Sequence, residues 1–209
     1  TTVDAVVVGR FIGKEALAAL GGTSSLLVDL SVGFFIGASA GAGVIISHCY
    51  GAKDKERLKY AVYASMKLAL FCGGALTVAG ILATPTALRW MNTPADVVEG
   101  ATLYLRVYFC GVIPSLLYNM GSSVLRAVGD SKRPLYFLIF TTAVNVGLDV
   151  LFVAVFKMGI FGAALATILA QASSAVLVLR TLLNTEESYR LVLRGCTKYP
   201  EVFRQIIRL

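Results

Sequence analysis

Residues 135–156 read LYFLIFTTAVNVGLDVLFVAVF, a run in which Asp149 is the only charged side chain. An α-helix rises about 1.5 Å per residue, so about 20 apolar residues cross the ~30 Å of hydrocarbon in a bilayer. The run is therefore long and apolar enough to form a transmembrane helix. Its single acid lies inside the hydrophobic stretch, where an ionisable group is energetically costly and is a candidate for function.

Four further runs of similar length contain no Asp, Glu, Lys or Arg at all, and they span residues 30–52, 68–88, 107–125 and 158–179. The whole chain is 57% apolar and only 15% charged, with a mean hydropathy of +0.77. Soluble domains are nearer half apolar and a quarter charged. The sequence therefore predicts an all-α integral membrane protein, a polytopic bundle with five complete helices.

The two ends of the chain differ from these runs. Residues 1–8 are apolar enough to be the end of a sixth helix that begins before Thr1, so we expect a fragment with a truncated first helix. We therefore expect residues 1–183 to form the transmembrane bundle. Residues 184–209 are basic and amphipathic. That pattern is typical of a segment on the cytoplasmic membrane surface, here a linker toward a missing second bundle.

The loops between the predicted helices differ in charge. Alternate loops lie on the same side of a membrane, and one set (51–59, 126–134 and the tail from 180) holds 13 of the 19 Lys and Arg residues. The other set holds only Arg10, Lys14, Arg89 and Lys157. By the positive-inside rule the Lys/Arg-rich loops are cytoplasmic, which predicts a multi-pass protein of the cytoplasmic membrane.

The positive-inside pattern also accounts for the net charge of +7, so no nucleic-acid partner is expected. The four cysteines are scattered, with no CxxC pair or Cys/His cluster, and His48 is the only histidine. Small apolar packing is the expected role of such cysteines. We expect no cofactor, no metal beyond Na⁺ and no catalytic residues.

Polar groups inside the predicted helices can be placed by depth. Asp149 is eight residues before Lys157, or about 12 Å below that end of its helix, and Asn145 is one turn deeper on the same face. Asp4 lies roughly 9–13 Å below the same surface, and Thr167 about 15 Å below it on the next helix. These four side chains on three helices are therefore predicted to meet at one level.

Two carboxylates, an amide and a hydroxyl are hard oxygen ligands, suited to a proton or an alkali cation. Binding such an ion can shift a helix bundle between two conformations if the ion binds them unequally. The sequence therefore predicts a site for H⁺ or Na⁺ at Asp4, Asn145, Asp149 and Thr167. There are two alternatives. Asp149 and Asn145 could form a structural polar contact between helices, and Asp4 could be a residue at the membrane interface.

Two further polar residues are candidates for a substrate cavity. Asp29 faces such a cavity or pairs with Arg10, and the sequence does not decide between the two. Gln171, like Thr167, has helix packing as its alternative role, since small and polar residues are common at contacts between membrane helices.

Several motifs follow one another along essentially the whole chain. They are Val3-Asp4, VGRFIG (8–13), ALAALG (16–21), GAKD (51–54), YLR (104–106) with Gly111 and Pro114, LRAVGDSKRP (125–134), Asn145 with Asp149, and GAALAT (162–167) with Gln171. Their order and spacing resemble those of the multidrug and toxic compound extrusion (MATE) family.

The resemblance implies the first six-helix lobe of a twelve-helix transporter, whose second bundle would be a partner along with the lipid bilayer and a small-molecule substrate. It also implies a cation site made by an Asp on the first helix, an Asn and an Asp on the fifth, and a Thr on the sixth. These match Asp4, Asn145, Asp149 and Thr167. Asp29 has no counterpart in this pattern.

The expected function is a cation-coupled antiporter that exports small cationic or amphipathic compounds. A flippase for lipid-linked saccharides, from the same superfamily, and a membrane scaffold or receptor remain alternatives. An intramembrane aspartyl protease would need two facing acids, which Asp4 and Asp149 could mimic, but no GxGD motif lies within a helix. The protein is therefore not expected to be an enzyme.

Overall fold

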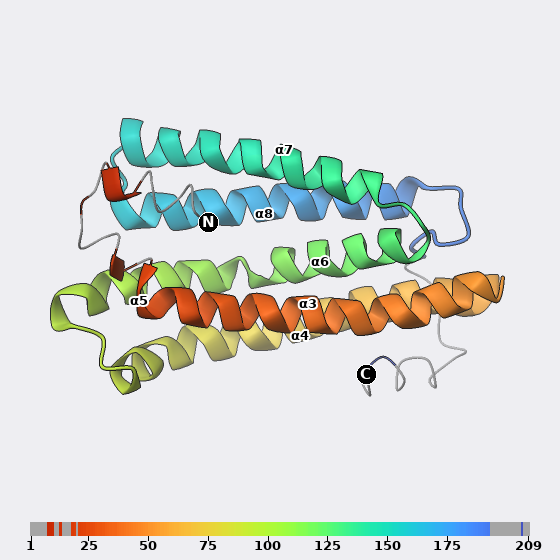
Figure 1. The fold of residues 1–209 in the computed structure, drawn as a ribbon, viewed down its shortest axis with the longest axis horizontal. Helices are drawn as coiled ribbons and strands as arrows, with labels where there is room; N and C mark the ends of the chain where they lie inside the picture. Colours follow the sequence, from red (N-terminus) through yellow and green to blue (C-terminus); the bar gives the residue numbers. More distant parts are fainter. Residues whose placement is uncertain (1–7, 11–12, 14–17, 20, 193–205, 207–209) are drawn as a thin grey trace.

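A computed structural model describes residues 8–10, 13, 18–19, 21–192 and 206 of the 209-residue chain. The regular structure of these residues is helical, with no strand among them. Figure 1 shows the helices side by side, with short turns at the two ends of the bundle. The fold is therefore the helical membrane bundle that the sequence predicted.

Helices α3 (Thr23–Gly51) and α4 (Lys55–Trp90) are the two longest. A tight turn joins them, in which Lys53 has a positive φ of 57°. Asp54 then begins α4, because its side chain accepts a hydrogen bond of 3.1 Å from the backbone N–H of Arg57. A side-chain acceptor at this position satisfies one of the free N–H groups of a helix start.

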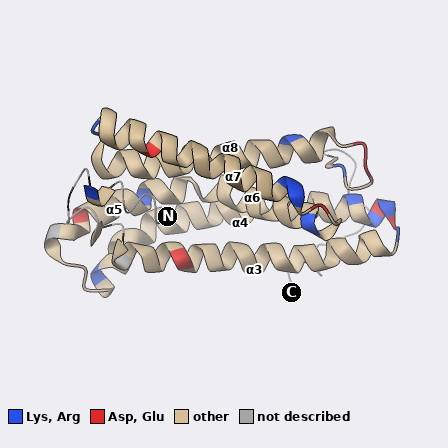
Figure 2. Cartoon of the chain, turned by 45° about the horizontal axis from the view of Figure 1, so that its top comes forward, with Lys and Arg blue, Asp and Glu red and all other residues tan. Residues whose placement is uncertain are grey.

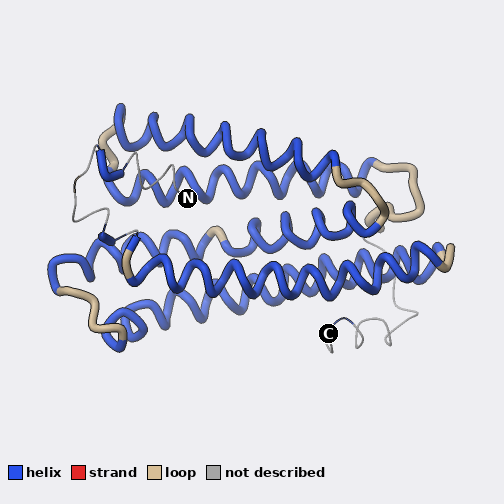
Figure 3. Tube along the Cα trace, in the orientation of Figure 1, coloured by secondary structure: helices blue, strands red, loops and turns tan. Residues whose placement is uncertain are grey.

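The third span is bent. Helices α5 (Ala95–Cys110) and α6 (Val112–Ala127) meet at an angle of 48°. A proline inside a helical span predicts a kink, and here the break lies three residues before Pro114, at Gly111. Proline lacks an N–H and its ring crowds the preceding turn, so the helix is disturbed before the proline. Figure 3 shows the interruption as a short non-helical stretch.

The last two spans are α7 (Lys132–Asp149), which continues as the π-helical segment η1 (Val150–Val155), and α8 (Gly159–Asn184). They pack against each other along their lengths. Lys157 and Gly159, both with positive φ, make the turn between them.

Four of the described helices are long and apolar enough to cross a membrane, and the bent pair α5–α6 makes a fifth. These are the five spans that the sequence predicted. Figure 2 shows Lys and Arg at both ends of the bundle, more densely at the end that holds the α3–α4 and α6–α7 turns. Large apolar side chains such as Leu30, Phe71 and Leu82 are more than 70% exposed, which suits contact with lipid.

Helix α6 lies in the middle of the bundle, between α8 and the α3–α4 pair (Figure 1). Small residues allow this close packing. The Ser123 hydroxyl on α6 donates a hydrogen bond of 2.6 Å to the backbone oxygen of Ser39 on α3. On the other side, a β-carbon at Gly121 would lie 2.7 Å from a methyl of Val178 on α8. Close backbone contact through small residues is typical of membrane helices.

Candidate functional site

Helix α7 carries a column of polar side chains, Thr141, Asn145 and Asp149, at intervals of four residues. Residues four apart share one face of a helix. That face is buried: Asp149 has no exposed surface and Asn145 is 6% exposed. Thr141 is half-buried overall, but its hydroxyl oxygen is shielded. An acid and an amide are thus enclosed inside the bundle, well within a membrane span.

Two polar atoms of this column have no hydrogen-bond partner among the described residues: the amide nitrogen of Asn145 and the hydroxyl of Thr141. A buried polar group without a partner costs about 1–3 kcal/mol. Such groups are uncommon in native proteins, and each calls for an explanation such as a bound ion, a water or a catalytic role. These two unpartnered groups beside a buried acid make this face of α7 a candidate site for a small polar ligand.

The backbone changes its hydrogen-bonding pattern directly after Asp149. The N–H of Phe156 donates to the carbonyl of Leu151, five residues back, and Met158 donates to Phe152, six residues back, both at 2.9 Å. Short π-helical segments within α-helices occur frequently at functional sites. No motif in the sequence indicates this π-helical segment. The position of Thr141, four residues before Asn145, is a signal that could have identified it as part of the polar column.

Helix α8 carries Thr167 and Gln171, one turn apart. The Thr167 hydroxyl donates a 3.1 Å hydrogen bond to the backbone oxygen of Ala163, so its lone pairs remain able to accept. The side-chain oxygen of Gln171 is buried and has no partner in the described part of the chain. It lies against the α5–α6 break, where a β-carbon on Gly111 would be 2.8 Å from it.

Asp29 is exposed on α3, near enough to Tyr108 of α5 to interact with it electrostatically. Helix α3 packs mainly against α4, α5 and α6, whereas Asp149 ends α7, which packs mainly against α8. The structure therefore does not group Asp29 with Asp149. Asp4 lies outside the described residues, so its meeting with Asp149 stays a prediction.

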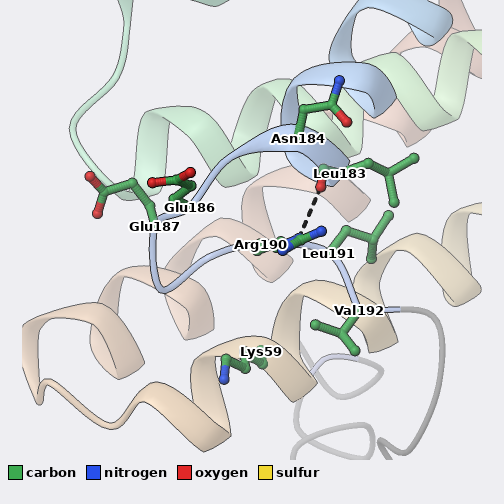
Figure 4. A pocket seen from close by; sticks show the side chains of 8 residues that line it. All are labelled: Lys59, Leu183, Asn184, Glu186, Glu187, Arg190, Leu191 and Val192. Atoms are coloured by element: carbon green, nitrogen blue, oxygen red, sulfur yellow. Dashed lines mark hydrogen bonds between the residues drawn. The ribbon is translucent and has the colours of Figure 1, made fainter.

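The described residues contain no group of three or more His, Cys, Asp or Glu side chains that could hold a metal ion. A cavity of about 710 Å³ lies far from Asp149, at the Lys/Arg-rich end, between the start of α4 and the chain that follows α8 (Figure 4). Its wall includes Lys59, Glu187 and Arg190, and the Arg190 Nε donates a 3.0 Å hydrogen bond to the backbone oxygen of Leu183.

Comparison with known sequences gives concordant matches. The MatE family model matches residues 1–151. The probable multidrug resistance protein YoeA of Bacillus subtilis is 37% identical over 171 residues, which is 80% of this chain and 37% of YoeA. The probable multidrug resistance protein YpnP of the same organism is 34% identical over 169 residues, which is 81% of this chain and 38% of YpnP.

Comparison with solved structures agrees. The crystal structure of MATE in the bent conformation matches with a TM-score of 0.93 and 26% identity, over 99% of this chain and 46% of that one. The chain thus spans less than half the length of the proteins it matches. The helical bundle, the order of its motifs and these similarities lead to one conclusion: the chain belongs to the MatE family, the multidrug and toxic compound extrusion transporters.

Proposed function

We propose that this chain is one lobe of a cation-coupled antiporter that exports small cationic or amphipathic compounds across the cytoplasmic membrane. The observation that carries the proposal is the fully buried carboxylate of Asp149, one turn from the buried Asn145 and directly before a π-helical segment. Relatives named as probable multidrug resistance proteins support the efflux of drug-like compounds.

The coupling step follows from burial. A bare carboxylate is costly at membrane depth, so the enclosed site favours Asp149 with a bound H⁺ or Na⁺. An open, hydrated arrangement would favour the ionised carboxylate. An ion that binds these two arrangements with different affinities shifts the balance between them, and a gradient can then drive transport. Asn145 and Thr167 would supply neutral oxygen ligands, and Asp4 the second charge.

The second lobe is the proposed partner. Because the chain covers 46% of the MATE crystal structure that it matches, a second helical bundle would complete the substrate path between the lobes. The Lys/Arg-rich turns would face the cytoplasm, as the positive-inside rule requires. Substrate would enter from that side and leave through the opposite end.

The test is dye efflux by the full-length protein that carries this chain, reconstituted in vesicles with an imposed H⁺ or Na⁺ gradient. Asp149→Asn keeps the shape of the side chain and removes its charge, so gradient-driven efflux should fall at least about tenfold, a ΔΔG‡ of about 1.4 kcal/mol or more. Glu186→Gln changes an exposed acid in the loop after α8 and is the matched control.

Efflux that persists unchanged in Asp149→Asn, with its full dependence on the gradient, would refute coupling at this residue. The two gradients imposed separately identify the ion. Absence of dye efflux in the unaltered protein, together with movement of a lipid-linked saccharide between leaflets, would favour the flippase alternative instead.

A further inference from the structure

A second polar pocket lies at the end of the bundle away from the Lys/Arg-rich turns, between the end of α4 and the first three turns of α5. We call it the α4–α5 pocket. Its volume is about 420 Å³, and it is lined by Pro85 and Arg89 of α4 and by Glu99, Thr102 and Arg106 of α5. It contains none of the residues assigned to the proposed cation site.

The α4–α5 pocket lies where lipid headgroups are expected. Trp90, at the end of α4, is 83% exposed. Exposed tryptophans mark the boundary between hydrocarbon and headgroups. Arg89 is its immediate neighbour in the chain, and Glu99 is in the second turn of α5. The pocket therefore opens at headgroup level and extends toward the hydrocarbon.

The two arginines converge on this pocket because of helix geometry. Side chains on an α-helix tilt toward its N-terminus. Arg106 is eleven residues into α5, about 16 Å along the axis, and the tilt directs its side chain back toward the headgroup level. Arg89 is in the last turn of α4, so the same tilt directs it away from the helix end, toward Arg106.

The three charged side chains of the pocket are exposed, and none of them forms an ion pair with another described residue. Of the three, Arg106 is the most costly to place in the membrane, because its charge lies deepest and needs an anion or water close by. Its planar guanidinium matches a phosphate group well. Glu99, on the same face of α5, adds a site for a cation. The pocket thus offers two positive groups and one negative group.

We propose that the α4–α5 pocket binds a phospholipid with a zwitterionic, primary-amine headgroup, as in phosphatidylethanolamine. The phosphate is held by Arg89 and Arg106, and the ammonium is held by Glu99. A headgroup without the ammonium, as in phosphatidylglycerol, leaves Glu99 opposed to a net negative lipid. A quaternary amine, as in phosphatidylcholine, has no N–H to donate to the carboxylate, so it is bound less well.

The test uses the full-length protein extracted from bilayers of equal parts phosphatidylethanolamine, phosphatidylglycerol and phosphatidylcholine, with retained lipids identified by native mass spectrometry. We expect the unaltered protein to retain phosphatidylethanolamine preferentially. Arg106→Gln should lower this retention several-fold. Glu99→Gln should keep lipid binding but change the preference to phosphatidylglycerol, a switch that a loss of folding cannot imitate. Lys157→Asn removes a positive charge from another turn at the same end and should change nothing.

Retention of the same lipids in the same proportions by Arg106→Gln and by Glu99→Gln would overturn the proposal. If Arg106→Gln does not assemble, Arg89→Gln at the helix end provides the same comparison. Excess inorganic phosphate should not displace the lipid. If phosphate displaces the lipid and stabilises the protein against thermal unfolding as much as the lipid does, the pocket is a site for free phosphate. That outcome would also refute the lipid proposal.

Discussion

At the scale of single residues, the contact between α3 and α6 depends on a missing side chain. Gly43 on α3 lies against Ser123 on α6, where an added β-carbon would be 2.5 Å from the serine hydroxyl but 3.9 Å from the serine β-carbon. The first distance is a clash and the second an ordinary contact. The hydroxyl is fixed because it donates to the backbone oxygen of Ser39. A β-carbon at position 43 would therefore clash with one atom, the hydroxyl oxygen of Ser123.

This contact predicts a coupled pair of substitutions. Gly43→Ala should destabilise the protein by about 1–3 kcal/mol, because the new methyl displaces the Ser123 hydroxyl from its buried hydrogen bond. Ser123→Ala should cost about 1 kcal/mol by itself. The double variant should lose less stability than the two single variants lose together, because alanine at position 123 leaves room for the methyl group at position 43. Unfolding in mixed micelles measures all three.

Gly74→Ala on α4 is the matched control, because a β-carbon there meets no atom within 4 Å. It should be neutral or stabilising by up to about 1 kcal/mol, from helix propensity alone. Strict additivity of Gly43→Ala and Ser123→Ala would contradict the proposed clash.

At the scale of elements, the break between α5 and α6 is held by a neighbouring helix. The Thr77 hydroxyl on α4 donates a 3.0 Å hydrogen bond to the backbone oxygen of Phe109, in the last turn of α5. Pro114 has no N–H to offer Cys110, so the backbone around Gly111 has fewer internal donors than a continuous helix. A bend of this kind is stable in a membrane only when neighbours satisfy the freed groups.

The hydrogen bond predicts the effect of changing its donor. Thr77→Val keeps the shape of the side chain and removes the donor, so stability should fall by about 1–2 kcal/mol. Thr77→Ser keeps the hydroxyl and should retain most of the stability. The loss is measured by thermal unfolding in detergent, and equal effects of the two substitutions would exclude the hydrogen bond as the cause.

At the scale of the whole molecule, the longest helix is long enough to cross the whole membrane. Helix α4 has 36 residues and is about 54 Å long, well beyond the ~30 Å of hydrocarbon. Both of its ends therefore reach water. Its first residue, Lys55, is next to the Lys/Arg-rich α3–α4 turn, and Met91 follows its last turn.

This length predicts labelling from opposite sides. In the full-length protein with its native cysteines replaced, Lys55→Cys should react with a membrane-impermeant maleimide only from the cytoplasmic side. Met91→Cys should react only from the outside. In sealed vesicles the maleimide reaches only the outer face of the membrane, and in opened vesicles it reaches both faces, so the comparison shows on which side each cysteine lies. Reaction of both positions from one side would contradict the crossing by α4, and exchanged sides would reverse the predicted orientation.

The sequence by itself determined the five spans, because crossing hydrocarbon requires about 20 apolar residues in a row and that is a local property. It also indicated the bend near Pro114, and the depths of Asp149 and Asn145. These features depend on chain length and residue type, not on neighbours. The meeting of Asp4 with Asp149 was predicted on the same basis, and it remains a prediction because Asp4 lies outside the described residues.

Only the tertiary structure decided which faces are buried. Helices α3 and α7 are apolar on nearly every side, and lipid is as apolar as the protein interior, so no amphipathic pattern marks the packed face. Three features therefore could not be predicted from the sequence. They are the separation of Asp29 from Asp149, the π-helical segment after Asp149, and the hydrogen bond from Thr77 to the backbone oxygen of Phe109. Each of these depends on which helix lies alongside, because close packing and hydrogen bonds act between neighbours in space.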